Sequence, residues 1–95
     1  MRKIVLVTGA TKGIGEACAE RFAEGGYDVI ITGRDQEQLA SLETRLRGLQ
    51  ADVKALCFDV RDRRQCEEAV ASLEGKWADV DVLINNAGLA RGLDK

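Results

Sequence analysis

The first residues that suggest chemistry are three glycines, Gly9, Gly13 and Gly15, in the stretch VTGATKGIGEAC. Each glycine lowers the stability of a regular element by roughly 0.5–1 kcal/mol relative to alanine, so their clustering indicates a need for bare backbone. A helix that begins near Gly13 would direct free N–H groups and the positive end of its dipole at the preceding loop. We therefore expect this loop to bind a phosphate or pyrophosphate group.

The spacing of the glycines excludes two common phosphate-binding loops. A P-loop requires G-x-x-x-x-G-K-[ST], and no such lysine and hydroxyl pair follows here. The usual dinucleotide fingerprint, G-x-G-x-x-G, is also absent. The chain carries T-G-x-x-x-G-x-G from Thr8 to Gly15 instead. An ordinary tight turn between a strand and a helix is the alternative interpretation, although three glycines are more than such a turn requires.

Composition removes several other kinds of chemistry. The 95 residues include no histidine, so the usual neutral-pH base and the commonest metal ligand are missing, and we predict no metal site. A net charge of −2 gives no reason to expect nucleic acid or an anionic membrane as a partner. The N-terminal apolar run is too short for a secretory signal, and no segment approaches the ~20 apolar residues of a membrane span.

The three cysteines, Cys18, Cys57 and Cys66, are odd in number and show no C-x-x-C spacing. This pattern disfavours both a disulfide framework and a zinc site. We expect reduced, buried thiols, because free cysteine packs as a small hydrophobic residue. Such cysteine usage predicts a cytoplasmic protein.

The rest of the chain alternates between short apolar runs rich in β-branched residues and longer segments with helical spacing. This alternation predicts four strands and three helices. In chain order they are the strand 3–7, a helix from 13 to the Gly25–Gly26 stop, the strand 28–32, the helix 35–48, the strand 53–58, the helix 61–77 and the strand 81–84.

Apolar spacing also assigns a buried face to each predicted helix. Asp35 and Asp62 stand ahead of the second and third helices and are the predicted N-caps. The expected face residues are Ile14, Cys18 and Phe22 in the first helix, Leu39, Leu42, Leu46 and Leu49 in the second, and Cys66, Ala69, Val70 and Leu73 in the third.

Strands that alternate with helices are typical of an α/β protein with a parallel sheet covered on both faces. Right-handed crossovers leave few topologies, of which the simplest is a Rossmann-type doubly wound sheet with strand order 3-2-1-4. We expect residues 1–95 to form one unit, with the glycine loop at the switch point between the first and fourth strands. The fourth strand would be an open edge, so we predict that the isolated chain is marginally stable or associates through that edge.

Two further motifs follow the later strands, Asp59-Val60 after the third and Asn85-Asn86-Ala87-Gly88 after the fourth. Together with the glycine loop, they make the chain closely similar to the short-chain dehydrogenase/reductase family, in its classical branch. The resemblance covers the whole chain but only the N-terminal third to half of a family member. Residues 1–95 would thus be the dinucleotide-binding portion of a single-domain Rossmann fold.

The resemblance implies a role for each motif. The glycine loop would wrap the pyrophosphate, Asp59 would accept a hydrogen bond from the adenine amino group, and the Val60 backbone would flank the ring. Asn86 to Gly88 would line the ribose on the nicotinamide side, and a purely structural role is the alternative for Asn85 and Asn86. The implied cofactor-binding residues are Gly9, Ala10, Thr11, Lys12, Gly13, Ile14, Gly15, Arg34, Asp59, Val60, Asn86, Ala87 and Gly88.

The end of the second strand decides between NAD and NADP. Proteins that bind NAD place an acidic residue against the ribose hydroxyls, whereas proteins that bind NADP use a nearby arginine for the 2′-phosphate. In the family the acidic residue usually ends this strand, where the chain has Gly33, and Arg34 follows with a planar guanidinium suited to phosphate. Lys12 resembles the basic residue that NADP-using members carry in the loop. Asp35 fits an N-cap better than a ribose ligand, so we predict NADP rather than NAD.

The chain lacks the catalytic group that the resemblance implies. Family members transfer a hydride between the nicotinamide and a carbonyl/hydroxyl pair, with a tyrosine in Tyr-x-x-x-Lys and an upstream serine. The only tyrosine is Tyr27, followed four residues later by Ile31, and we interpret it as a packing residue. No catalytic residue is therefore assigned within the chain, which looks like part of a longer, homo-oligomeric enzyme.

The run NNAGLARGLDK is similar to the same stretch in family members that oxidise 3-hydroxy acids such as serine and allo-threonine. A loop shared by many members is the alternative. A non-catalytic NAD(P)-binding module is the competing function, and a Tyr-x-x-x-Lys farther along the full gene would favour the enzyme. A methyl-transferring protein with an adenosyl cofactor is disfavoured, because its acidic ribose residue should stand where Gly33 does.

Overall fold

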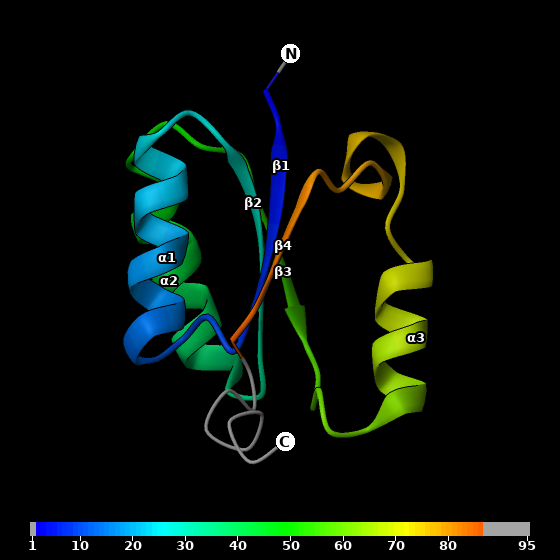
Figure 1. Cartoon of the computed structure of the whole chain (residues 1–95). Helices are drawn as coiled ribbons and strands as arrows, with labels where there is room; N and C mark the ends of the chain where they lie inside the picture. Colours follow the sequence, from blue (N-terminus) through cyan, green and yellow to red (C-terminus); the bar gives the residue numbers. More distant parts are fainter. Residues whose placement is uncertain (1, 87–95) are drawn as a thin grey trace.

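Short runs of β-branched residues form a four-stranded parallel sheet in the computed structural model, which describes residues 2–86 (Figure 1). The strand order β3-β2-β1-β4 confirms the predicted topology. In the central strand, Val5 pairs with Val29 on one side and with Val82 on the other. The three strands that contain these residues therefore end together at one edge of the sheet. The strands are β1 (Ile4–Thr8), β2 (Asp28–Gly33), β3 (Val53–Cys57) and β4 (Val82–Asn85).

Helices cover the two faces of the sheet unequally. Helices α1 (Gly13–Glu24) and α2 (Gln36–Arg47) lie side by side on one face, while α3 (Arg63–Ala71) lies on the other (Figure 1). A one-turn 3₁₀ helix, η1 (Gly75–Ala78), follows α3. The larger apolar core lies between the sheet and the α1–α2 pair, and a smaller cluster around Ile30 lies on the α3 side.

The buried face of α1 differs from the predicted one. Gly15, Ala19 and Ala23 are the buried residues of this helix, whereas Ile14 is 63% exposed. Cys18 and Phe22 are only half-buried. Small residues face the sheet because they let the helix backbone approach it closely. The spacing of large apolar side chains does not indicate such a contact.

Helix α2 follows its prediction more closely. Leu39, Leu42 and Leu46 are buried, as expected. Leu49 lies beyond the end of the helix at Arg47 and is 36% exposed. The helix ends where it was predicted to end, because Gly48, with its low helix propensity, takes the C-cap position, and Leu49 therefore falls outside the buried face to which it was assigned.

The predicted helix 61–77 is wrong in length and in its buried face. The structure divides this segment into α3 and η1, and no residue of α3 is buried. Val70 is 57% exposed, and only Leu73, which follows the helix, reaches the core. On this side of the sheet the described residues offer α3 few apolar partners, and Leu83 of β4 is likewise 61% exposed.

The prediction of buried thiols is also wrong. Cys57 is exposed at the end of β3, and Cys18 and Cys66 are half-buried, although all three are free. Tyr27 does pack as predicted, with its ring edge-to-face against Phe22 at a centroid distance of 4.8 Å. No helix within residues 2–86 has the length and apolar character needed to cross a membrane.

A charged cluster closes the amino ends of the strands. The Asp28 carboxylate is almost fully buried and pairs with Arg2 at 2.8 Å and with Lys76 of η1 at 3.1 Å. It also accepts the backbone N–H of Asp52 at 3.0 Å, and Lys76 contacts the Asp52 carboxylate as well. Burial raises the pKa of Asp28, but these hydrogen bonds and positive charges outweigh it and hold that pKa below its ordinary value. The cluster ties η1 to β2 and β3.

Candidate functional site

The glycine loop leaves β1 at the carboxyl edge of the sheet and enters α1. Gly9 and Gly13 have φ angles of 60° and 52°, a left-handed conformation that favours glycine. The space beside Gly13 is open, since an added Cβ would meet no atom within 4 Å. Lys12 takes the N-cap position of α1 without a side-chain hydrogen bond to the helix, so within residues 2–86 no side chain caps the first-turn N–H groups. Free donors at the positive end of a helix dipole are chemically suited to an anion.

Gly15 serves packing rather than access. It is buried, and a Cβ at this position would lie 2.2 Å from the carbonyl oxygen of Gly9 and 2.7 Å from Nδ2 of Asn86. The Asn86 amide donates to that same Gly9 oxygen at 3.2 Å, from just beyond β4. The third glycine therefore lets α1 press against a loop that the fourth strand also holds.

The end of β2 braces the loop from the other side. Thr32 is fully buried, its hydroxyl accepts the backbone N–H of Gly9 at 3.3 Å, and its carbonyl accepts the backbone N–H of Ala10 at 2.9 Å. Sequence reasoning missed Thr32. The available signal was a hydroxyl at the carboxyl end of an otherwise aliphatic strand, since a buried polar group must find a hydrogen-bond partner.

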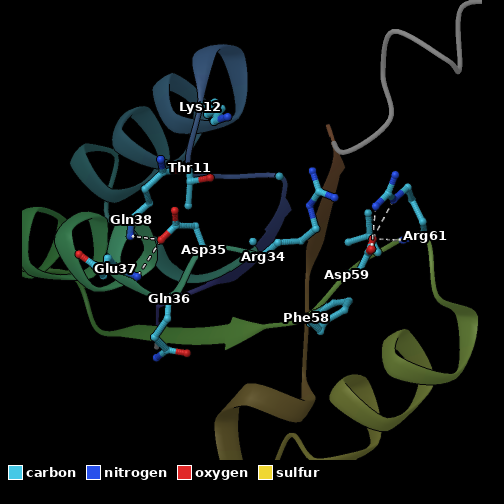
Figure 2. A pocket seen from close by; sticks show the side chains of 13 residues that line it. Thr11, Lys12, Arg34, Asp35, Gln36, Glu37, Gln38, Phe58, Asp59 and Arg61 are labelled. Atoms are coloured by element: carbon cyan, nitrogen blue, oxygen red, sulfur yellow. Dashed lines mark hydrogen bonds and ion pairs between the residues drawn. The ribbon is translucent and has the colours of Figure 1, made fainter.

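An open cleft of about 830 Å³ lies between the glycine loop and the ends of β2 and β3 (Figure 2). This volume is within the usual range for small-molecule and cofactor sites. Within residues 2–86 no group of His, Cys, Asp or Glu side chains could hold a metal ion. The cleft is lined by Gly9, Thr11, Lys12, Gly33, Arg34, Asp35, Gln36, Glu37, Gln38, Phe58, Asp59, Val60 and Arg61.

The segment after β2 presents a cation to this cleft and engages its carboxylate in the cap of α2. Oδ1 of Asp35 accepts the backbone N–H groups of Glu37 at 3.0 Å and Gln38 at 3.1 Å, which confirms it as the N-cap of α2. The exposed guanidinium of Arg34 makes no hydrogen bond within the described part of the chain. Gly33 is buried, where a Cβ would lie 3.0 Å from Cγ2 of Thr11, so this glycine makes room for the loop.

The turn after β3 contains a second charged pair. Asp59 accepts from Nε of Arg61 at 3.1 Å, from Nη2 at 3.0 Å and from the backbone N–H of the same residue at 2.9 Å (Figure 2). These hydrogen bonds from Arg61, helped by the charge of Arg34, lower the pKa of Asp59 to about 2. The same pairing raises the pKa of Arg61. Arg61 was not among the predicted site residues.

The structure gathers some of the predicted site residues and leaves others outside the cleft. Gly9, Thr11, Lys12, Arg34, Asp59 and Val60 line it. Ala10 and Gly15 are buried, Gly13 and Ile14 are exposed at the start of α1, and Asn86 contacts the loop from β4. Ala87 and Gly88 lie outside the described residues.

The residues present fit a dinucleotide that carries an additional phosphate. Uncapped helix N–H groups beside an open Gly13 suit a diphosphate. An arginine whose guanidinium has no hydrogen-bond partner within residues 2–86 suits a phosphate on the adjacent ribose. The nearest acidic competitor, Asp35, is held by the backbone of α2.

Comparison with known proteins gives one family match. The sequence profile of the family described as short chain dehydrogenase matches residues 3–94. An NADP-dependent 3-hydroxy acid dehydrogenase of Salmonella typhi is 53% identical over 91 residues, which cover 96% of this chain and 36% of the relative. The chain thus spans about a third of the length of this curated relative.

Solved structures agree in fold. A serine dehydrogenase in a closed form complexed with NADP⁺ matches 84% of this chain and 31% of its own, with a TM-score of 0.76 and 46% identity. A short-chain dehydrogenase from Sphingobium yanoikuyae in complex with NADPH matches 90% of this chain and 34% of its own, with a TM-score of 0.80 and 39% identity.

Proposed function

Because this chain belongs to the short-chain dehydrogenase family, we propose that it is the cofactor-binding part of an NADP-dependent oxidoreductase. The observation that carries the proposal is the charge arrangement after β2. Arg34 is exposed to the cleft without a hydrogen-bond partner among residues 2–86, while the carboxylate of Asp35 is engaged by α2. The arrangement favours a ribose that carries a phosphate over one that carries free hydroxyls.

Each wall of the cleft has a distinct binding task in this proposal. The first-turn N–H groups of α1 and the backbone from Gly9 to Ile14 hold the diphosphate. Arg34 and Lys12 bind the 2′-phosphate, and bidentate guanidinium–phosphate hydrogen bonds of this kind contribute roughly 1.5–3 kcal/mol. Asp59 accepts from the adenine amino group through Oδ2, since a carboxylate oxygen has two acceptor sites and Arg61 occupies only one of those on Oδ2.

Asn86 has both a structural and a binding task. It holds the Gly9 carbonyl in place through its Nδ2 atom. With Ala87 and Gly88 it lines the ribose on the nicotinamide side of the proposed site. Both tasks keep the reactive end of the cofactor at the carboxyl ends of β1 and β4, where open α/β sheets bind their ligands.

The proposed reaction is hydride transfer between nicotinamide and a carbonyl/hydroxyl pair on a small-molecule substrate. When bound, the nicotinamide supplies or accepts the hydride. Residues 2–86 supply binding and orientation, and the general acid–base and the substrate pocket belong to the remainder of a longer protein. A relative that is 53% identical and named a 3-hydroxy acid dehydrogenase supports a hydroxy acid as the substrate.

For the whole protein we propose a cytoplasmic homo-oligomer that binds neither nucleic acid nor a membrane. Residues 1–95 are its N-terminal dinucleotide-binding portion within a single Rossmann domain. The coverage of about a third of each relative supports this assignment.

Dissociation constants for NADP⁺ and NAD⁺, measured by isothermal titration calorimetry, test the proposal. We expect NADP⁺ to bind about 10- to 100-fold more tightly than NAD⁺. Only NADP⁺ carries the 2′-phosphate that can form charge-assisted hydrogen bonds with the protein. Tighter binding of NAD⁺ would overturn the cofactor assignment. Binding of neither cofactor would overturn the site itself.

A further inference from the structure

Arg61 is the one cation lining the cleft that neither the glycine loop nor the β2–α2 segment supplies. It stands in the turn after β3, and three of its N–H groups engage the Asp59 carboxylate. Both carboxylate oxygens take part, Oδ1 with two donors and Oδ2 with one. All three donors belong to one residue that lies only two positions after Asp59 in the chain, so little conformational freedom is lost in forming the pair.

Asp59 has a second cation within electrostatic reach. The charge of Arg34 also lowers the pKa of Asp59, although the two side chains form no hydrogen bond. Figure 2 shows the guanidinium groups of Arg34 and Arg61 directed the same way along the cleft, one from the end of β2 and the other from the turn after β3. One carboxylate thus stands near two guanidinium groups but is bound to only one of them.

The cleft is lined by equal numbers of positively and negatively charged side chains. Its lining includes three cations, Lys12, Arg34 and Arg61, and three carboxylates, Asp35, Glu37 and Asp59. Helix α2 holds Asp35 by its backbone, and Arg61 holds Asp59. If either carboxylate were released, it would compete with a phosphate for the remaining cations.

We propose that Arg61 is a positioning residue for cofactor selection, which holds the Asp59 carboxylate and so leaves Arg34 available for the 2′-phosphate. The inference rests on the proposed NADP function and extends it to a residue outside the predicted set. Arg61 acts through Asp59 and does not itself contact the phosphate. Removal of the Arg61 side chain changes the preference between NADP⁺ and NAD⁺ more than it changes the affinity for the adenosine diphosphate part that both cofactors contain.

Four forms of the protein test this inference at low ionic strength, where exposed charges are least screened. They are the wild type, Arg61→Ala, Asp59→Asn and the double variant. The measured quantity is the ratio of the NAD⁺ to the NADP⁺ dissociation constant. We expect Arg61→Ala to lower the ratio about fivefold, the usual upper range for an exposed ion pair, through weaker NADP⁺ binding.

The double variant should recover the wild-type ratio, because a neutral asparagine does not capture Arg34. Asp59→Asn alone should keep the ratio at or above the wild-type value. Arg63→Ala, which removes one positive charge from the exposed start of α3, is the matched control and should leave the ratio unchanged. Thermal unfolding of each variant verifies that the fold is kept.

Three results separate the possible failures. A wild type that shows no preference for NADP⁺ overturns the proposed function and this inference with it. A wild type that prefers NADP⁺ while Arg61→Ala keeps the ratio overturns the inference alone. A loss in Arg61→Ala that the double variant does not recover also overturns it, since Arg61 would then contact the phosphate directly.

A cofactor-free readout is independent of the proposed function. The carboxyl ¹³C resonance of Asp59 reports its titration, and in the wild type Arg61 holds that pKa at about 2. In Arg61→Ala the pKa should rise but stay below the ordinary value of 3.8, because the backbone N–H of residue 61 and the charge of Arg34 still act on the carboxylate. Adding Arg34→Ala to that variant should raise the pKa again, and the absence of a further rise would contradict the capture of Arg34.

Discussion

A Cβ atom at Gly15 would lie 2.2 Å from the carbonyl oxygen of Gly9. The close approach joins the first turn of α1 to the loop that follows β1. Since the neighbouring atom belongs to the backbone, it cannot move aside as a flexible side chain would. The position therefore admits only glycine without a displacement of the helix or the loop.

We predict that Gly15→Ala lowers the free energy of unfolding by about 1–3 kcal/mol, the usual effect of overpacking. It should also weaken NADP⁺ and NAD⁺ binding together, because the loop moves. Gly13→Ala is the matched control, since its Cβ enters open space and only the left-handed backbone opposes it, by about 1–2 kcal/mol. Urea unfolding measures both. Full stability of Gly15→Ala would contradict the close packing of α1.

The cap of α2 gives a second prediction. Asp35→Ala should lower the free energy of unfolding by about 0.5–2 kcal/mol, because two backbone N–H groups lose their acceptor. Asp35→Asn should be nearly neutral, since asparagine caps as well as aspartate. Neither change should weaken NAD⁺ binding. A loss of NAD⁺ affinity in both variants would instead identify Asp35 as a ribose ligand.

Arg34 should carry most of the preference between the two cofactors. Arg34→Ala should weaken NADP⁺ binding about 10- to 100-fold and leave NAD⁺ binding within about twofold, because only the phosphate contact is lost. Arg64→Ala, an exposed change in α3, controls for the loss of one positive charge. Calorimetric titration of both cofactors provides the comparison, and equal losses for NADP⁺ and NAD⁺ would count against a phosphate contact.

The cluster at the opposite edge of the sheet predicts a pH dependence of stability. The pKa of Asp28 is lower in the folded state than the ordinary value of 3.8, so its charged form stabilises the fold. That contribution is complete above pH 3.8 and is lost as the pH falls through the lowered pKa. Asp28→Asn should therefore lower the free energy of unfolding near neutral pH by about 1–3 kcal/mol, since its partners are partly exposed.

Denaturant unfolding at several pH values tests this prediction. The difference between wild type and Asp28→Asn should shrink towards zero in acid. Asp79→Asn changes an exposed carboxylate that has no ion pair within residues 2–86 and should show no such pH-dependent difference. A constant difference from neutral pH to below the lowered pKa would mean that packing, and not charge, explains the Asp28 contribution.

The topology was predictable because the strands are short and β-branched and the crossovers are right-handed, which left the order 3-2-1-4 as the simplest solution. The N-caps Asp35 and Asp62 were predictable because capping depends on local spacing, and each accepts the backbone N–H three residues on. The face of α1 was not, because Gly15, Ala19 and Ala23 make contact through their small size rather than their hydrophobicity.

The site was only partly predictable for a related reason. Arg34 and the glycine loop follow from residue type and position at strand ends. The pairing of Arg61 with Asp59 depends on the conformation of a turn, which residue types alone do not determine. The role of Thr32 depends on a loop from another strand reaching its hydroxyl. Both became visible only with the three-dimensional arrangement.

The hydrogen bond from Asn86 to Gly9 joins residues 77 positions apart in the chain. During synthesis at about 5–20 residues per second, Gly9 would leave the ribosome about 4–15 seconds before its partner. Until then the nascent loop lacks one of its two braces, whereas Thr32 arrives only 23 positions later. The glycine loop therefore gains its second brace only after β4 has been synthesised, and a synonymous codon change that slows the ribosome between β2 and β4 would prolong the time that the loop spends without it.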